Sequence, residues 1–250
     1  MKIGLIGIVG DAMKADFFGT CEKIAAIGYG GLEAVESHLL DGDVTANVAR
    51  FRATGLQVLT STASREELRD NFNTVRTNAL AVGAPRVSVW WSEANSRDGL
   101  MRDCELYNEA GAKLAAEGIK LCYHNHDQEF KNVIDGVYAW DIIAMHTDPK
   151  ALYFTVDAGW VGVGGEDPVR IIRKLAGRVA ALHLKDFADF ADRTSFTTLG
   201  TGALDLPAIV QAANENGVEW GVVEQDRLRN LSAMDTIATS FLNLKERGLV

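Results

Sequence analysis

The sequence contains few cysteines, and none of them belongs to a recognisable motif. Cys21, Cys104 and Cys122 are odd in number and far apart, and no pair has CxxC spacing. This pattern suggests neither a disulfide framework nor a zinc knuckle. It fits the reducing environment of the cytoplasm, which is where we expect the protein to act.

Long apolar runs and clusters of basic residues are also missing. No segment approaches the roughly 18 apolar residues that a membrane-spanning helix needs, and the apolar start, 1–10, lacks a signal-like cleavage pattern. Lys and Arg number 25 against 34 Asp and Glu, which gives a formal net charge of −9. Binding to nucleic-acid phosphates depends on basic clusters. We therefore expect neither a membrane nor a nucleic-acid partner.

Instead of linkers or low-complexity stretches, the 250 residues hold a regular alternation of two patterns. Short apolar runs predict buried strands, and segments with helical spacing, many of them ended by Gly, predict helices. The predicted strands are 2–9, 31–36, 56–60, 86–90, 120–124, 152–157, 179–184 and 219–224. The predicted helices are 16–27, 43–54, 65–82, 99–117, 135–146, 168–175, 207–216 and 234–247.

This alternation favours an α/β fold of one specific kind, a (β/α)8 TIM barrel that forms a single domain over residues 1–250. An open doubly wound sheet has the same alternation, but no GxGxxG follows the first strand. The barrel predicts that the active site lies at the carboxyl ends of the strands.

Histidines and acids gather at these predicted strand ends. His124 ends the fifth strand and His126 comes just after it, and the two lie on the same face, since side chains alternate along a strand. Asp157, His183 and Glu224 end the next three strands and are expected to converge near the barrel axis. Imidazoles and carboxylates together suit Mn, Co, Fe, Ni or Zn. The strand ends therefore predict a metal site.

Each of the last three residues also has an ordinary structural alternative. Asp157 could cap the following helix, His183 could be hydrogen-bonded within its strand, and Glu224 could pair with Lys185. Their occurrence at three successive strand ends is what favours the metal site over these alternatives.

Other strand-end residues are candidates for substrate binding or for structural contacts. Glu36 ends the second strand, whereas Glu33 is expected on the opposite face, paired with a helix. Of Trp90 and Trp91, one is expected to form an apolar wall over a ligand, and Trp160 could form a second wall. Aromatic faces suit the C–H surfaces of sugars.

The motifs HNHDQEF, VDAGW, LHLKD, GTGALDL and VVEQD, in this order, resemble those of the xylose isomerase-like sugar isomerase/epimerase barrels over essentially the whole chain. The resemblance implies one divalent metal ion (Mn, Co, Mg or Zn), with Asp157, His183 and Glu224 as three of its ligands. Many relatives have a glutamate at the tip of the fifth strand, where this chain has His124. Because relatives usually combine two or three carboxylates with one histidine, we expect Glu129 to fold back as the fourth ligand.

The resemblance further implies a sugar or cyclitol isomerase/epimerase that removes a proton next to a carbonyl through a metal-stabilised enediolate. Glu224 is then the expected base, and His126 and His124 are candidates for the second acid/base group. Lys185 could bind a substrate oxygen or form a salt bridge with Asp157 or Glu224. A dehydratase or lyase of the inosose or 3-keto-glycoside type is the alternative, and a non-catalytic sugar-binding barrel is the second.

Two further expectations concern a turn and the partners. The turn at 200–205 contains Gly-Thr-Gly and could offer N–H groups to a substrate oxyanion or phosphate, or it could simply need positive φ. The expected partner is a small-molecule carbohydrate, and assembly into a homo-oligomer stays open.

Overall fold

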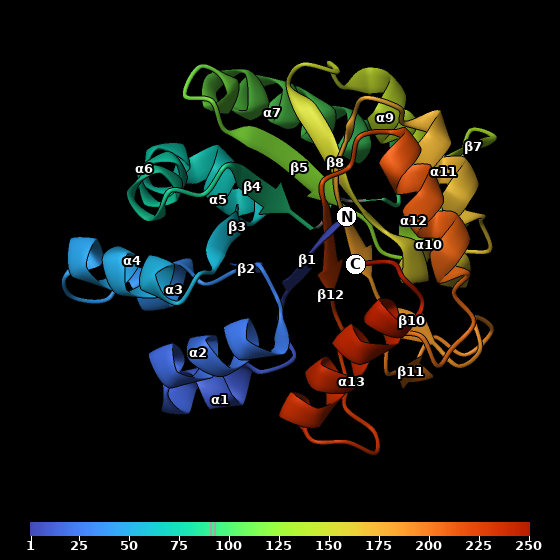
Figure 1. Ribbon diagram of the computed structural model, residues 1–250. Coiled ribbons are helices and arrows are strands. Elements are labelled where there is room, and N and C mark those ends of the chain that lie inside the picture. The colour runs from blue at the N-terminus through green and yellow to red at the C-terminus, as the bar shows by residue number, and fades with distance from the viewer. Residues whose placement is uncertain (91, 93) are drawn as a thin grey trace.

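Eight parallel strands pair edge to edge into a closed barrel in the computed structural model, which describes residues 1–90, 92 and 94–250 (Figure 1). Their order around the barrel is β1-β12-β9-β8-β5-β4-β3-β2, so β1 lies between the second and the last strand and closes the sheet. The strands are β1 (Lys2–Leu5), β2 (Gly31–Glu33), β3 (Gln57–Thr62), β4 (Arg86–Val89), β5 (Lys120–His124), β8 (Leu152–Asp157), β9 (Val179–Leu184) and β12 (Trp220–Val223). The predicted (β/α)8 TIM barrel is confirmed.

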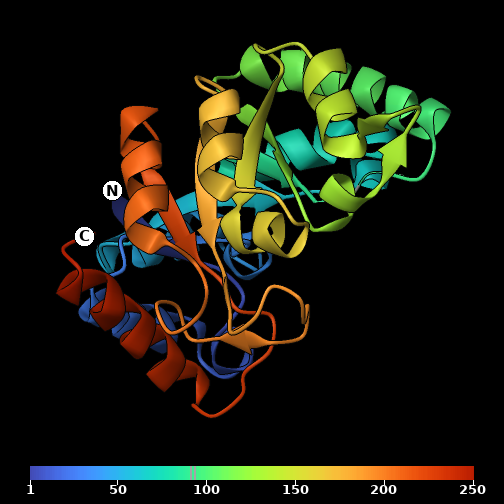
Figure 2. The same cartoon turned by 90° about the vertical axis from the view of Figure 1, so that its right-hand side faces the viewer.

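Helices surround the strands on all sides (Figure 1). They are α1 (Gly10–Ala15), α2 (Phe17–Ile27), α3 (Glu36–Leu39), α4 (Val44–Ala53), α5 (Arg65–Asp70), α6 (Phe72–Val82), α7 (Arg97–Ala115), α8 (Gln128–Lys131), α9 (Ala139–His146), α10 (Ala158–Val163), α11 (Pro168–Lys174), α12 (Leu206–Glu215) and α13 (Ala233–Glu246). Figure 2 shows α7 and α9 packed side by side on the outside of the barrel.

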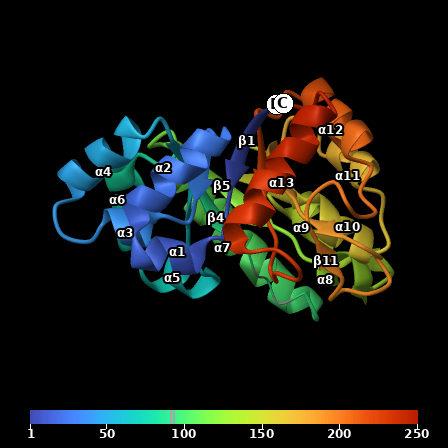
Figure 3. The same cartoon turned by 60° about the horizontal axis from the view of Figure 1, so that its bottom comes forward.

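The last helix completes the ring of helices. α13 lies between α2 and α12 (Figure 3). Tyr29, just after α2, donates its hydroxyl to the carbonyl of Ile237 in α13 at 2.8 Å, and its ring lies 5.1 Å from that of Phe241. The two ends of the chain are thereby held together on one side of the barrel.

Local signals in the sequence explain where the helices begin. In each of eight helices of the described chain, a side-chain oxygen of the residue before the first turn accepts a backbone N–H of that turn, which satisfies a donor that would otherwise lack a partner. These residues are Asp16, Asp43, Ser64, Ser96, Asp157, Asp167, Asp205 and Ser232. Ser64 and Glu67 form a complete capping box. Pro168 and Pro207 occupy first-turn positions, where the missing N–H costs nothing.

The strands carry the core, as expected for a parallel sheet that is covered by helices. Leu121, Phe154 and Leu182, from β5, β8 and β9, are fully buried. Many of the exceptions to this apolar pattern are polar residues at the carboxyl ends of the strands, where the loops leave the barrel. Thr60 and Arg86 are buried polar residues that lie further from this rim.

Some predicted elements divide or shift in the structure. The predicted helix 65–82 is interrupted at Asn71, whose φ of −133° is not helical, so α5 and α6 are separate. The predicted helix 135–146 begins only at α9, because β6 (Val133–Ile134) and β7 (Val137–Tyr138) form a hairpin turned by Asp135 and Gly136 with positive φ. Neither α10 nor the hairpin of β10 (Asp186–Phe187) and β11 (Phe196–Thr197) was predicted.

Two expectations drawn from missing features can be compared with the described residues. All three cysteines are buried free thiols. Across the described part of the chain, no helix combines the length and the hydrophobicity needed to cross a bilayer.

Candidate active site

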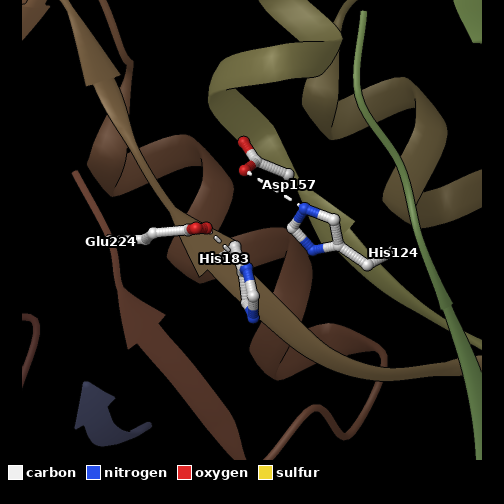
Figure 4. A group of neighbouring side chains, drawn as sticks. All are labelled: His124, Asp157, His183 and Glu224. Carbon is white, nitrogen blue, oxygen red and sulfur yellow. Dashed lines mark hydrogen bonds and ion pairs between the residues drawn. The ribbon is translucent and has the colours of Figure 1, made fainter. Parts of the chain in front are cut away.

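Four polar side chains meet at the carboxyl ends of β5, β8, β9 and β12 (Figure 4). They are His124, Asp157, His183 and Glu224, and one potential ligand atom from each lies within 4.8 Å of all the others. Parallel strands of a barrel end at a common rim, which is why residues so far apart in sequence converge here. The structure therefore brings together the three strand-end residues that the sequence singled out, with His124 as the fourth.

Two buried atoms of this group lack hydrogen bonds and suit a divalent metal, although one of them, Oδ2 of Asp157, also lies 3.3 Å from Nζ of Lys185. Oδ2 of Asp157 and Nδ1 of His124 are buried without a hydrogen-bond partner, and Nε2 of His124 lies 4.0 Å from Oδ2 of Asp157. Buried polar atoms normally have partners, so such exceptions need an explanation. Two imidazoles and two carboxylates form a donor set that Zn, Co, Mn and Fe accept. The residues present therefore fit the expected ion.

Asp157 caps the following helix with one carboxylate oxygen, and its other oxygen belongs to the potential ligand group. Its Oδ1 accepts the backbone N–H of Trp160 at 2.9 Å and caps α10. Asn125 holds its backbone by accepting the Asp157 N–H at 2.9 Å. This arrangement fixes the carboxylate and leaves Oδ2 directed at the group. Burial raises the pKa of Asp157 to about 6.

His183 is held between two carboxylates. Its Nδ1 lies 2.8 Å from Oε2 of Glu224, and its Nε2 lies 2.8 Å from Oε2 of Glu33. Burial alone lowers the pKa of His183, but the charges of Glu33 and Glu224 outweigh burial and raise it to about 10. The imidazole is therefore protonated at neutral pH when no cation competes with the proton.

The expected outward position of Glu33 is wrong. β2 ends at Glu33, its pairing with β3 shifts register between Leu32 and Glu33, and Ala34 has a φ of 57°. These irregularities break the alternation on which the expectation depended. Glu33 is only 4% exposed and lies inside the barrel, whereas Glu36 starts α3 and accepts hydrogen bonds from the N–H and the hydroxyl of Thr62.

Glu129, expected from the sequence as the fourth ligand, is not brought into the group. Its carboxylate is fully buried and accepts the hydroxyl of Tyr123 at 2.6 Å and the backbone N–H of His126 at 2.9 Å. Burial raises its pKa despite these hydrogen bonds. The structure places His124 with the other potential ligands and uses Glu129 to hold the loop after β5.

Lys185 forms the salt bridges that were the alternative to substrate binding. Its Nζ lies 3.3 Å from Asp157, 3.1 Å from Glu224 and 2.7 Å from Asp226, and the residue is only 1% exposed. Burial by itself lowers the pKa of Lys185, but these three carboxylates raise it far above its usual value. Lys185 is thus a buried cation directly beside two of the potential ligands.

A cavity of about 320 Å³ opens over this group. Its lining residues are Ile6, Glu33, Ala34, Thr62, Ser88, Trp90, His124, His126, His183 and Glu224. Burial, and after it the charge of Lys185, lowers the pKa of His126 to about 4, and its Nδ1 has no hydrogen-bond partner. His126 is therefore a neutral imidazole that lines the cavity, and its Nδ1 is buried without a partner.

The expected aromatic walls are only partly found. Trp90 is 40% exposed and lines the cavity, and Trp91 lies outside the described residues. Trp160 is buried behind His126, with ring centroids 5.8 Å apart, and packs against Phe187 at 5.1 Å. It supports His126 and is not among the described lining residues.

A second cavity of about 350 Å³ adjoins the first at Glu224, which lines both. It is lined by Gly7, Ile8, Glu224, Gln225, Asp226 and Leu228. Oε1 of Gln225 is buried without a hydrogen-bond partner, and Leu228 is 44% exposed at its edge. We call this space the side lobe.

The Gly-Thr-Gly turn serves the fold. The N–H groups of Gly200 and Gly202 each donate to Oδ2 of Asp186 at 2.9 Å, and that of Leu204 donates to Oδ1 at 3.2 Å. The φ of Gly200 is 86°. The turn therefore needs positive φ, and its amides bind an internal carboxylate.

Sequence reasoning missed Glu33, Thr62 and Ser88 at the cavity. Thr62 and Ser88 are small polar residues near the carboxyl ends of β3 and β4, and the rim position alone could have indicated them. Glu33 gave no such signal, because its orientation depends on the irregular end of β2.

Comparison with known proteins agrees with the barrel fold. A family model described as a xylose isomerase-like TIM barrel matches residues 21–242. An inosose dehydratase of Clostridium beijerinckii is 27% identical over an alignment that covers 91% of this chain and 90% of that protein. Two solved structures share the fold. A sugar phosphate isomerase/epimerase from Parabacteroides distasonis superposes with a TM-score of 0.83 at 23% identity, covering 100% of this chain and 95% of the other. The IolI protein with a bound zinc atom gives 0.77 at 16% identity, covering 98% and 97%.

Proposed function

The chain belongs to the xylose isomerase-like TIM barrel family, and from this we propose that it is a metal-dependent dehydratase that removes water from a keto-cyclitol or keto-sugar. The observation that carries the proposal is the similarity to an inosose dehydratase over 91% of this chain and 90% of that protein, combined with the ligand group under a cavity. Dehydration, the alternative in the sequence analysis, thus replaces isomerisation as the preferred reaction. Both begin with removal of a proton next to a carbonyl.

His124, Asp157, His183 and Glu224 would hold the divalent ion, and their two carboxylates would balance its charge. The bound ion supplies a Lewis acid that polarises substrate oxygens. Imidazole and carboxylate ligands leave several metals acceptable, manganese and zinc among them.

Glu224 is the base in this proposal. Burial alone raises the pKa of Glu224, but Lys185 and His183 outweigh burial and hold it well below its usual range, so the group is a carboxylate. It takes the proton from the carbon next to the carbonyl, and the C–H electron pair moves toward the carbonyl to form an enolate.

Elimination then follows at the neighbouring carbon. The enolate electrons re-form the carbonyl and a C=C bond, the C–O bond of the neighbouring hydroxyl breaks, and this hydroxyl receives the proton from Glu224 and leaves as water. His126, a neutral imidazole that lines the cavity, would hold the departing hydroxyl by a hydrogen bond. Glu224 ends the cycle as a carboxylate again.

The lining of the cavity favours an uncharged ring as substrate. None of the described lining residues is Lys or Arg, and nearby Lys185 already faces three carboxylates. A phosphate would therefore meet the carboxylates of Glu33 and Glu224, with no free Lys or Arg among the described lining residues to bind it. The exposed ring face of Trp90 suits the C–H face of a sugar or cyclitol.

The side lobe favours a second candidate function, a lyase that expels an alcohol in place of water. Glu224 lines both cavities, and the side lobe is also lined by the polar residues Gln225 and Asp226 and by the exposed apolar side chain of Leu228. A group attached to the departing oxygen, as in a 3-keto-glycoside, would lie there. The elimination itself would be the same.

The test is to load the purified protein with Mn²⁺, Co²⁺ or Zn²⁺ and incubate it with a keto-inositol in D₂O. We expect loss of one water in the mass spectrum, no activity after chelation, and a drop of at least about 10²-fold for Glu224→Gln at matched metal content. An epimer without water loss would establish the isomerase reading, and release of an alcohol from a 3-keto-glycoside would establish the second candidate. A metal-loaded protein that does none of these is not an enzyme of this type.

A further inference from the structure

A buried chain of hydrogen bonds runs from the ligand group across the inside of the barrel. Nε2 of His183 lies 2.8 Å from Oε2 of Glu33, and Oε1 of Glu33 accepts the hydroxyl of Thr60 at 2.7 Å. Nε of Arg86 donates to the same hydroxyl oxygen at 3.2 Å. All four residues are buried, and they come from β9, β2, β3 and β4.

The two ring nitrogens of His183 face different surroundings. Nδ1 lies 2.8 Å from Oε2 of Glu224, a member of the ligand group, whereas Nε2 faces Glu33, which is outside that group. A neutral imidazole carries one N–H and one lone pair, and only the lone pair can bind a cation. Whichever nitrogen keeps the hydrogen therefore decides which one can be a ligand.

We propose that Glu33 is a positioning residue that keeps the hydrogen on Nε2 of His183 and thereby presents Nδ1 to the metal. The inference rests on the proposed metal site and goes beyond it, because it assigns a role to a residue that is not a ligand. Carboxylates that accept the second N–H of a ligating histidine fix its tautomer and its ring orientation.

The surroundings of Glu33 make it rigid enough for this role. Thr60 uses its hydroxyl hydrogen for Glu33 and its oxygen for Arg86, so its rotamer is fixed from both sides. Arg86 supplies the positive charge that offsets the buried carboxylate, since an uncompensated buried charge is costly. Neither residue touches the ligand group directly.

The charges around the site balance if Glu33 is paired with Arg86 and is not a ligand of the ion. Asp157 and Glu224 offset a divalent ion, Lys185 and Asp226 form a pair at 2.7 Å, and Glu33 is matched by Arg86 through Thr60. Glu33 is therefore not needed as a further ligand. Its charge is free to polarise the Nε2–H bond of His183.

The first experiment tests the wild-type protein and uses one variant only to assign the NMR signals. Protein labelled with ¹⁵N-histidine and loaded with Zn²⁺ would be studied by NMR to determine the tautomer of His183. The ring-nitrogen signals of His183 are identified by their absence from the spectrum of His183→Gln. We expect a solvent-protected hydrogen on Nε2 and a metal-shifted Nδ1. Coordination through Nε2 would overturn the inference.

The second experiment measures Zn²⁺ affinity by competition with a chromophoric chelator. Glu33→Gln should weaken binding by about 10–100-fold, the range typical of such outer partners, and should remove the protection of the Nε2 hydrogen. Thr60→Val should have a smaller effect in the same direction. Asp103→Asn, which changes a buried carboxylate paired with Arg65 outside the site, is the control and should keep the wild-type affinity.

The outcomes separate a failure of the proposed metal site from a failure of the role assigned to Glu33. If wild-type protein binds no metal, the proposed function and this inference fail together. If wild-type protein binds metal but folded Glu33→Gln binds it equally well, only the role of Glu33 fails. If Glu33→Gln does not fold, the tautomer of His183 in the Zn²⁺-loaded wild-type protein still tests the role of Glu33.

Discussion

The hydroxyl of Tyr123 donates a 2.6 Å hydrogen bond to Glu129, whose other oxygen accepts the backbone N–H of His126 at 2.9 Å. Both carboxylate oxygens of Glu129 therefore accept hydrogen bonds from the end of β5 and from the loop that follows it. Tyr123 and His124 point to opposite faces of the strand, because side chains alternate, and only His124 faces the ligand group. The identity of the fourth ligand therefore depends on which face Glu129 can reach.

We predict that His124→Gln weakens metal binding more than Glu129→Gln does. The loss for His124→Gln should exceed the roughly 10–100-fold effect of changing a residue outside the ligand set. Glu129→Gln should instead lower the free energy of unfolding by about 1–3 kcal/mol, because it disturbs buried hydrogen bonds. Chelator competition and urea unfolding measure the two effects, and the opposite ranking of affinities would make Glu129 the ligand.

The barrel could be predicted from the sequence because its signal is repeated. Apolar runs and helical patterns alternate along the whole chain, so an error at one boundary leaves the fold unchanged. The split of 65–82 at Asn71 is such an error. The convergence of Asp157, His183 and Glu224 followed from the same rule, since parallel strands of a barrel end at one rim.

The parts that could not be predicted depend on single backbone irregularities or single contacts. The position of Glu33 depends on a register shift and on the positive φ of Ala34, which no periodicity reveals. The position of Glu129 depends on a hydrogen bond to Tyr123. A family's usual ligand balance favoured Glu129, but local geometry places His124 in the group.

Lys185 should oppose metal binding. Its Nζ lies 3.3 Å from Asp157 and 3.1 Å from Glu224, so a bound cation would lie close to a buried ammonium group. Replacing it by Met removes this repulsion, and we expect the affinity for Zn²⁺ to rise by about tenfold or more. Lys131→Met removes a half-exposed lysine that pairs with Asp127 outside the ligand group, and as the control it should leave the affinity unchanged. Weaker binding by Lys185→Met would show that Lys185 mainly orients the ligands.

Asp186 should hold the segment that crosses from β10 to α12. It accepts N–H groups from Gly200, Gly202 and Leu204, and a Cβ added to Gly202 would lie 2.3 Å from its Oδ1. We expect Asp186→Ala and Gly202→Ala to make this segment much more sensitive to limited proteolysis, with cleavage mapped by mass spectrometry. Gly10→Ala, where φ is not positive, as at Gly202, and where no atom lies within 4 Å of an added Cβ, is the matched control for replacing a glycine. Equal cleavage in all three variants would show that Asp186 does not hold the segment.

Glu33 and Arg86 should be coupled in stability, since Thr60 joins them by hydrogen bonds of 2.7 and 3.2 Å. Glu33→Gln and Arg86→Met should each lower the free energy of unfolding of the metal-free protein by about 1–3 kcal/mol, because each leaves a buried polar partner behind. The double variant should lose less than the sum of the two, by about 0.5–3 kcal/mol. Strict additivity in urea unfolding would mean that the two side chains do not share a network.

Metal affinity should rise with pH, because the ion must displace a proton from His183. The carboxylates of Glu33 and Glu224 outweigh burial and raise the pKa of His183 to about 10, whereas burial raises that of Asp157 only to about 6. Between these values one proton is released for each ion bound, so the apparent affinity for Zn²⁺ should rise by about tenfold per pH unit. Chelator competition at pH 7, 8 and 9 would measure this slope.

The stability of the metal-free protein should change in the opposite direction over the same range. The pKa of His183 is raised above its unfolded value of roughly 6.5, so the folded state holds a proton that the unfolded state releases. The resulting stabilisation is fully present below about pH 6.5 and is lost as the pH rises toward about 10. His183→Gln cannot bind this proton and should show a flatter decline in chelator-treated samples. If wild type and His183→Gln lose stability in parallel while the affinity for Zn²⁺ stays level with pH, His183 is neutral in the fold, and its contacts with Glu33 and Glu224 do not hold a second proton.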